Sequence, residues 1–286
     1  MSIQSTIDAT AGTLSPSLAR VAEFIRANPA AVVDNTINEL AALCDTSVAS
    51  VVRFCRSIGL SGYAQLRMAL ASEIGKERAQ FGDGMSFGSD ITDADSLSDI
   101  VAKIRSREIL AIEETLAALD VDDLGRAASL ISASDRILLY GVGASQFIAA
   151  DLGHKLLRIG RPAVVLSDPH EAWACAALPQ PGTVAIAFSH RGETPETNRF
   201  VQIASDAAGS TVGVTSVRDS TLGQNVGIVL TTQARETDFR AGAMVSRIAQ
   251  LALVDCLFTA IAQGRYQQTL EALRVTRAAT HGSGRP

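Results

Sequence analysis

Residues 37–70 read INELAALCDTSVASVVRFCRSIGLSGYAQLRMAL, and this stretch carries the signals for two short helices joined by a tight turn. Thr36 is a suitable N-cap for a helix over Ile37–Leu43. Ser47 is a suitable N-cap for a second helix that ends at Ser57. Two short helices around such a turn predict a helix-turn-helix, which is a unit that binds DNA.

The second helix carries two kinds of residue. Its expected packing positions are Val48, Val51, Val52 and Cys55. Another face carries small polar and basic residues at a spacing of three, namely Ser47, Ser50, Arg53 and Arg56. Small polar residues permit close approach to the major groove, and arginines bind guanine edges or phosphates. From spacing alone, an ordinary helical hairpin with two solvated arginines fits equally well.

The whole stretch resembles the helix-turn-helix of the RpiR family of sugar-responsive regulators. The resemblance covers the Ser-capped second helix, VVRFCR at 51–56 and the following GLSGY at 59–63. It implies that the protein binds operator DNA through Ser47, Ser50, Arg53, Arg56, Tyr63 and Arg67. Family members often carry a charged residue where this chain has Val48, so Val48 is not counted among the expected base contacts.

The composition is that of an ordered globular protein, with 47% apolar and 19% charged residues, and 286 residues suit two domains. The net charge of −5 does not by itself suggest nucleic-acid binding. The local distribution of charge does suggest nucleic-acid binding. No acidic residue lies between Asp45 and Glu73, where Arg53, Arg56 and Arg67 are found.

The cysteines argue against zinc or a disulfide framework. They are Cys44, Cys55, Cys175 and Cys256. No Cys-x-x-Cys pair and no histidine at ligand spacing accompanies them, so we expect reduced core residues, no metal and no cofactor. The N-terminus shows no basic segment followed by an apolar run. The apolar stretch Ile248–Ile261 is interrupted by polar residues, so we expect a cytoplasmic protein without a membrane partner.

Composition changes along the chain predict its organisation. Residues 78–95 are rich in Gly, Asp and Ser, which is typical of a linker, and an amphipathic helix follows from Ser96. We therefore expect five segments. They are a helix-turn-helix domain over 1–77, a linker over 78–95, connecting helices over 96–125, an α/β domain over 126–265, and a C-terminal helix and tail over 266–286.

Short apolar runs alternate with helical stretches in the α/β domain. The runs are Ile137–Tyr140, Ala163–Leu166, Val184–Phe188, Thr211–Thr215 and Ile228–Leu230. Continuous hydrophobicity indicates burial on both faces, and strand–helix alternation indicates parallel pairing. The predicted fold class is therefore an all-helical domain followed by a doubly wound, flavodoxin-like sheet of five parallel strands. Ligands of such sheets bind beyond the carboxyl ends of the strands.

Two loops at those ends are candidates for anion binding. Gly141-Val-Gly-Ala-Ser145 opens a helix after the first strand, with glycines that let an anion approach the backbone. Ser189-His-Arg-Gly-Glu-Thr194 follows the third strand and offers hydroxyls and a guanidinium. A dinucleotide site is disfavoured because Gln146 and Phe147 stand where a third glycine is expected.

The second loop is similar to the S-x-S-G-x-T signature of the sugar isomerase (SIS) domain, which the RpiR family joins to its helix-turn-helix. The resemblance implies that a phosphorylated sugar binds through Gly141, Gly143, Ser145, Ser189, Arg191, Gly192 and Thr194. Arg191 stands where the family usually has a second serine. It either contacts the phosphate of the effector or plugs the pocket.

The alternative function is a SIS-type phosphosugar isomerase. Isomerisation needs a base beside the sugar carbon, and the candidates by residue type are His170, Glu171, His190, Glu193 and Glu236. None is fixed by spacing, so we expect no catalytic residue and no enzyme. The expected protein is a sugar-responsive regulator, most often a repressor in similar proteins, that acts as a homodimer or homotetramer.

Overall fold

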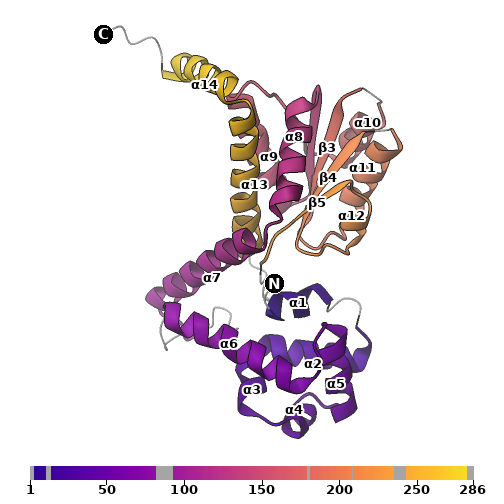
Figure 1. Cartoon of the computed structure of the whole chain (residues 1–286), viewed down its shortest axis with the longest axis vertical. Helices are drawn as coiled ribbons and strands as arrows, with labels where there is room; N and C mark the ends of the chain where they lie inside the picture. Colours follow the sequence, from indigo (N-terminus) through magenta and orange to yellow (C-terminus); the bar gives the residue numbers. More distant parts are fainter. Residues whose placement is uncertain are drawn as a thin grey trace. The chain divides into compact units, whose positions relative to one another are not determined.

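The structure is a computed structural model that describes residues 3–10, 14–81, 93–178, 181–207, 209–234 and 243–281 (Figure 1). The chain divides into two compact units. The first consists of Met1–Glu114 with Ala234–Ala241, and the second of Thr115–Gln233 with Gly242–Pro286. The division falls inside a helix, so the expected connecting segment 96–125 is shared between the units.

Six helices and most of a seventh form the first unit. They are α1 (Ile3–Thr10), α2 (Pro16–Ala27), α3 (Pro29–Asp34), α4 (Ile37–Leu43), α5 (Val48–Ser57), α6 (Tyr63–Phe81) and α7 (Leu97–Ala118). The predicted bounds of α4 and α5 are confirmed. The core of the unit gathers one apolar stripe from each of α1 to α6, including Ile7, Val21, Leu40, Phe54 and Leu66.

Two expectations for this unit need correction. Val48 was expected to pack but is 37% exposed, whereas Phe54, which the pattern did not select, is fully buried. Helix α6 continues to Phe81, into the expected linker; residues 82–92 of that linker lie outside the described residues.

The second unit alternates helices and strands. Its helices are α8 (Val121–Ala133), α9 (Ala144–Arg158), α10 (Pro169–Ala177), α11 (Pro195–Asp206), α12 (Thr221–Gln224), α13 (Met244–Gly264) and α14 (Tyr266–His281). Its strands are β1 (Arg136–Gly141), β2 (Val164–Leu166), β3 (Thr183–Phe188), β4 (Ser210–Thr215) and β5 (Ile228–Thr231). All five pair in parallel in the order β2-β1-β3-β4-β5, which confirms the predicted doubly wound sheet.

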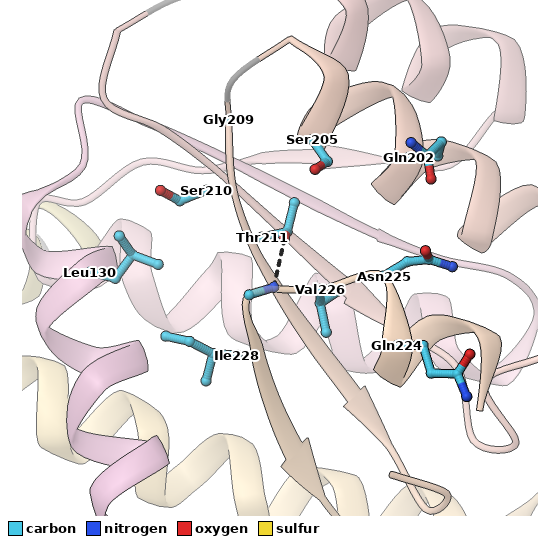
Figure 2. Close-up of a pocket in the computed structure, with 11 residues that line it drawn as sticks. Leu130, Gln202, Ser205, Gly209, Ser210, Thr211, Gln224, Asn225, Val226 and Ile228 are labelled. Atoms are coloured by element: carbon cyan, nitrogen blue, oxygen red, sulfur yellow. Dashed lines mark hydrogen bonds between the residues drawn. The ribbon is translucent and has the colours of Figure 1, made fainter. Parts of the chain in front are cut away.

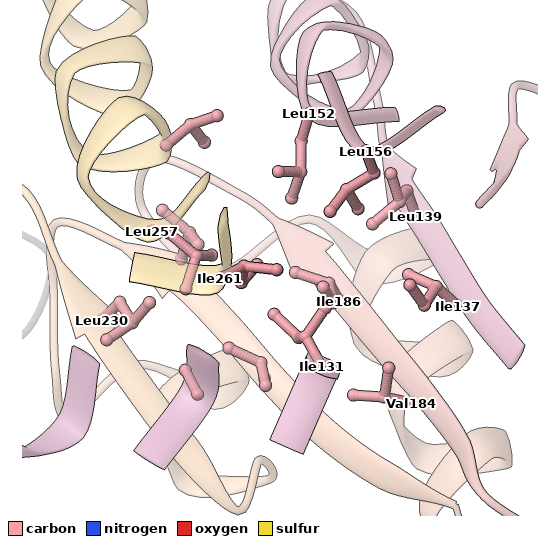
Figure 3. Close-up of a cluster of buried hydrophobic side chains, with 14 of the residues drawn as sticks. Ile131, Ile137, Leu139, Leu152, Leu156, Val184, Ile186, Leu230, Leu257 and Ile261 are labelled. Carbon is pink, nitrogen blue, oxygen red and sulfur yellow. The ribbon is translucent and has the colours of Figure 1, made fainter. Parts of the chain in front are cut away.

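Helices cover both faces of this sheet (Figure 1). Alternate residues of the strands enter two different cores. Ile137, Leu139, Ile186 and Leu230 pack with residues of α8, α9 and α13 (Figure 3). On the other face, Leu138, Tyr140, Ala185 and Ala187 pack with residues of α10 and α11. The prediction that every strand is buried on both faces was wrong for β2. Val164 and Val165 of this edge strand are 44% and 37% exposed.

Helix α13 is the one helix among the described residues that is long and apolar enough to cross a membrane, with a mean hydropathy of 1.6. Its interruptions by polar residues do not lower that mean below the range of spanning helices. Leu253, Val254, Leu257 and Ile261 of α13 are nevertheless fully buried against the sheet and its helices. The same hydropathy is expected for a helix in the core of a globular domain.

Candidate functional site

The two helices of the helix-turn-helix are held by their caps. Thr36 and Glu39 form a capping box, in which Thr36 N donates to Glu39 Oε2 at 2.7 Å and Glu39 N donates to Thr36 Oγ1 at 3.4 Å. These hydrogen bonds hold the pKa of the Glu39 carboxyl below its usual value. Asp45 adopts a positive φ of 46° in the turn between the helices, and its carbonyl accepts a bond from Arg20 at 3.1 Å.

The N-terminus of α5 contains a chain of side-chain hydrogen bonds. Ser47 Oγ accepts from Ser50 N at 3.2 Å and lies 3.1 Å from Ser50 Oγ. Arg53 Nη2 donates to Ser50 Oγ at 3.2 Å. Ser50 is only 3% exposed, which corrects the expectation that it faces DNA. Its hydroxyl instead connects the cap of the helix to the guanidinium of Arg53.

The other predicted DNA contacts divide in a similar way. Arg53, Arg56 and Arg67 are exposed, as a DNA-binding role requires. The hydroxyl of Tyr63 donates to two backbone carbonyls. It lies 2.9 Å from the carbonyl oxygen of Val32 and 2.8 Å from the carbonyl oxygen of Asn35. Burial raises the pKa of Tyr63. Its single proton is therefore engaged inside the unit, and the residue positions α6 against the loop after α3.

Sequence reasoning set Val48 aside, but the structure exposes it in the first turn of α5, beside Ser47. An exposed apolar side chain at this position can contact the methyl group of thymine. The available signal was its place directly after the N-cap, at the end of the helix that enters the groove in proteins of this kind.

The loop after β1 meets α9 through an unusual backbone. Gly143 has φ 61° and ψ −124°, and a Cβ on Gly141 would lie 2.8 Å from the carbonyl oxygen of Ser145. Both positions therefore require glycine. The amides of Ser145 and Gln146 donate to the carbonyls of Val142 and Gly143, so these two amides close the first turn of α9. Ser145 keeps its hydroxyl at the start of the helix, where an anion is favoured.

The loop after β3 is tightly braced. The carbonyl of His190 accepts from Thr215 Oγ1 at 3.0 Å and from both the amide and the hydroxyl of Ser216 at 2.7 Å. Gly192 has φ 73°, and a Cβ there would lie 2.0 Å from Ser220 Oγ. Within this rigid turn Ser189 Oγ and Thr194 Oγ1 lie 2.9 Å apart. The loop thus holds Thr194 and the buried Ser189 as a fixed pair of hydroxyls.

The side chain of Arg191 is exposed. A Cβ on the neighbouring Gly192 would lie 2.0 Å from Ser220 Oγ and 3.0 Å from Thr215 Oγ1, so the interior of the loop has no room for a side chain there. An exposed guanidinium on the rim of the loop can reach a bound dianion, and phosphate contact by Arg191 stays a prediction.

The candidate bases of an isomerase are dispersed. Glu193 accepts from the amide and the hydroxyl of Thr221, so it caps α12. His170 is exposed and packs edge-on against Trp173. Glu171 is exposed in the first turn of α10, and His190 is buried after β3. Glu236 lies outside the described residues.

A surface depression of about 610 Å³ lies at the amino ends of the strands, opposite the carboxyl ends that carry the two glycine turns (Figure 2). It is lined at the amino ends of β4 and β5 by Ser210, Thr211 and Ile228 and by exposed side chains such as Gln202 and Gln224. The two glycine turns lie instead at the carboxyl ends of the strands, where parallel α/β sheets bind ligands, so the predicted ligand site is separate from this depression. The described residues contain no cluster of metal-ligating side chains.

All four cysteines are free thiols. Burial raises the pKa of Cys44 and of Cys55 to about 11, so both remain protonated in the core of the first unit at neutral pH. A protonated thiol is a poor nucleophile and a poor metal ligand. These two residues therefore act as small apolar packing groups.

Comparison with known proteins matches both units. The model of the rpiR-family helix-turn-helix domain matches residues 1–77, and the model of the SIS domain matches residues 129–260. An HTH-type transcriptional regulator of Caldanaerobacter subterraneus is 36% identical over 264 residues, 92% of each chain. The regulator YbbH of Bacillus subtilis is 32% identical over 93% of this chain and 92% of its own.

One solved structure extends over both units. The NanR protein of Vibrio vulnificus, in complex with ManNAc-6P, is 26% identical and covers 97% of each chain with a TM-score of 0.61. Its order of domains is therefore the order found here.

Proposed function

This chain belongs to the RpiR family of transcriptional regulators, and from that premise we propose that α5 binds operator DNA while a phosphorylated sugar, bound at the carboxyl edge of the sheet, controls that binding. The observation that carries the ligand assignment is the pair of hydroxyls of Ser189 and Thr194, 2.9 Å apart on a braced loop. Each hydroxyl of such a pair can turn to donate a hydrogen bond to a phosphate oxygen.

The proposed DNA contacts come from α5 and α6. Arg53 and Arg56 contact guanine edges or phosphates, and Arg67 contacts the phosphate backbone. Ser47 and Val48 lie where the helix approaches the bases. Ser50 and Tyr63, whose hydroxyls are engaged within the unit, hold these groups in place.

The proposed ligand contacts come from both glycine turns. Ser145, Ser189 and Thr194 bind the phosphate, with Arg191 adding a positive charge from the rim. Gly141, Gly143 and Gly192 let the backbone approach it. The complex of NanR with ManNAc-6P supports a phosphorylated amino sugar as one candidate class of effector.

We propose that the sugar is bound and released unchanged. The SIS domain is also found in isomerases, but the relatives that cover this chain are named as regulators. Three of the four described candidate bases support this proposal, since Glu193 is engaged as a cap and His170 and Glu171 lie exposed on α10. The protein then acts in the cytoplasm, as a repressor of carbohydrate genes.

A thermal-shift screen of the full-length protein tests the ligand site. We expect one or more members of a panel of hexose, pentose, amino-sugar and sugar-acid phosphates to raise the melting temperature, because a ligand that binds only the native state stabilises it. The same compound should release operator DNA in a gel-shift assay. Ser145→Ala with Ser189→Ala should abolish both effects, whereas Ser205→Ala at the opposite edge should leave both unchanged. A double variant that still releases DNA would refute the site.

A further inference from the structure

Five buried polar side chains lie at the carboxyl edge of the sheet, outside the two glycine turns. They are Thr115 in the last turn of α7, Thr232 and Gln233 directly after β5, and Ser246 and Gln250 in the first two turns of α13. Each is 3% exposed or less. We name them the buried amide cluster.

The register of two elements explains how the cluster arises. Thr232 follows Leu230 by two residues and so continues the same face of β5, while Gln250 precedes Leu257 by seven residues, two turns along the same stripe of α13. Leu230 and Leu257 belong to one apolar cluster (Figure 3). Toward the carboxyl edge, both elements therefore change from apolar to polar residues while remaining buried.

A reciprocal pair of hydrogen bonds fixes one member of the cluster. Thr115 Oγ1 donates to the carbonyl of Gln233 at 3.0 Å and accepts from its amide at 2.9 Å. Both groups are buried, so the backbone of Gln233 is held in place and its side-chain amide is left for another partner.

Among the described residues, three side-chain atoms of the cluster have no hydrogen-bond partner: Thr232 Oγ1, Gln233 Nε2 and Gln250 Nε2. Burial of an unpaired amide or hydroxyl is unfavourable, because the group loses its hydrogen bonds to water. Apolar residues at these positions would avoid that cost, as they do one and two turns further along α13 at Val254 and Leu257. The arrangement is the one expected of a site built for a polar ligand.

We propose that the buried amide cluster binds the hydroxyl groups of the carbohydrate effector, through Gln250, Gln233 and Thr232, while the glycine turns bind its phosphate. This inference rests on the proposed function. Neutral amides and hydroxyls match the paired donors and acceptors of a sugar ring, and the cluster offers no carboxylate that would repel a phosphate.

The distances within the sheet suit this division. Strand β5 lies two positions from β3, which carries Ser189, and neighbouring strands are about 4.8 Å apart, so the two ends are separated by about 10 Å. A six-carbon sugar phosphate is of that length. Helices α9 and α13 both follow strands of this parallel sheet and both begin at its carboxyl edge, so Ser145 and Ser246 occupy the first turns of helices that start at the same edge.

Discrimination between sugars then resides in this cluster. A site that hydrogen-bonds a ligand hydroxyl rejects the analogue without it, since the buried partner would stay unpaired. The glycine turns alone would accept any phosphate monoester.

The test is a Gln250→Met variant of the full-length protein. Calorimetric titration uses the sugar phosphate that most stabilises the wild type in the panel, together with inorganic phosphate. We expect the Kd for that sugar phosphate to rise about tenfold, the loss of one hydrogen bond, and the Kd for inorganic phosphate to stay within about twofold. The melting temperature of the unliganded variant should not fall, because the buried Nε2 group that is removed has no hydrogen-bond partner among the described residues.

A matched control variant helps to separate the possible outcomes. Gln224→Met makes the same change in an exposed glutamine at the opposite edge and should leave both Kd values unchanged. If the panel stabilises the wild type and Gln250→Met equally, with unchanged Kd, the cluster is not a ligand site, although the proposed function stands. If no sugar phosphate stabilises the wild type beyond inorganic phosphate, both proposals are wrong. A lower melting temperature with unchanged Kd would assign Gln250 a purely structural role and would overturn the inference.

Discussion

Some residues of the first unit face solvent, and others hold those residues in position through hydrogen bonds. Ser50 illustrates the second kind, because a buried hydroxyl accepts from Arg53 and contacts the cap Ser47. Arginine side chains lose considerable rotamer freedom when they bind. A guanidinium that is already held by a neighbour loses less, so we propose that Ser50 contributes to recognition without contacting DNA.

Replacing Ser50 by alanine should therefore reduce specificity more than general affinity. We expect the preference of the full-length protein for operator over random DNA to fall about threefold to tenfold, because Arg53 loses one positioning bond. Fluorescence anisotropy with both DNAs measures this ratio. Arg53→Ala should lose about 1–3 kcal/mol of base discrimination, and the combined variant should resemble Arg53→Ala alone. An additive loss in the combined variant would show that Ser50 acts independently of Arg53.

The elements of the first unit are short, so their ends matter. Helix α5 has ten residues and begins with a side-chain cap from Ser47, and α4 has seven residues and begins with a capping box. Helices of this length are marginal in isolation. Their caps and the apolar stripe that includes Val51, Phe54 and Cys55 keep α5 in the orientation that exposes its arginines.

Changing the cap should separate stability from DNA binding. Ser47→Ala removes the acceptor for Ser50 N, so we expect the free energy of unfolding to fall by about 1 kcal/mol. Ser47→Asp keeps an acceptor and should restore the stability, while its negative charge repels the DNA phosphates and weakens operator binding. Urea denaturation and anisotropy titrations measure the two properties. Equal operator affinity of Ser47→Asp and wild type would place the start of α5 away from the DNA.

At the scale of the whole molecule, the chain joins one DNA-reading unit to one ligand-binding unit. A single helix-turn-helix presents few base contacts, and proteins with this motif usually bind two half-sites as symmetric dimers. Helix α7 continues from the first unit into the second, where Thr115 is hydrogen-bonded to the backbone of Gln233. Because α7 belongs to both units, a bound ligand can affect the DNA-binding unit if the ligand favours one of two conformations of the protein.

A two-half-site operator gives the molecular prediction. We expect light scattering to find an even number of protomers, and the operator to contain inverted half-sites whose centres lie about 10–10.5 base pairs, or a multiple of this, apart. Insertion of five base pairs between the half-sites should greatly weaken binding, because it places them on opposite faces of the duplex. Insertion of ten base pairs is the matched control. A monomer that binds a single half-site with full affinity would contradict this prediction.

Local sequence signals were sufficient to predict much of the secondary structure and the class of the sheet. The caps Thr36 and Ser47 determined where α4 and α5 begin, because capping depends on residues within one turn. The continuous apolar runs determined the parallel sheet, because only strands covered on both faces have that pattern. Even the glycine turns could be identified, since the positive φ of Gly143 and of Gly192 strongly favours glycine.

Only the tertiary structure decided which side chains on a given face reach solvent. Ser50 and Tyr63 have the composition of contact residues, yet neighbours from other turns and helices engage their hydroxyls, while Val48 is exposed. Likewise, nothing local marks Thr115, Gln233 and Gln250 as one group, because they are brought to the same edge of the sheet by packing between distant segments. Burial and hydrogen bonding of a side chain depend on what the rest of the chain places beside it, and periodicity within one helix or strand does not contain that information.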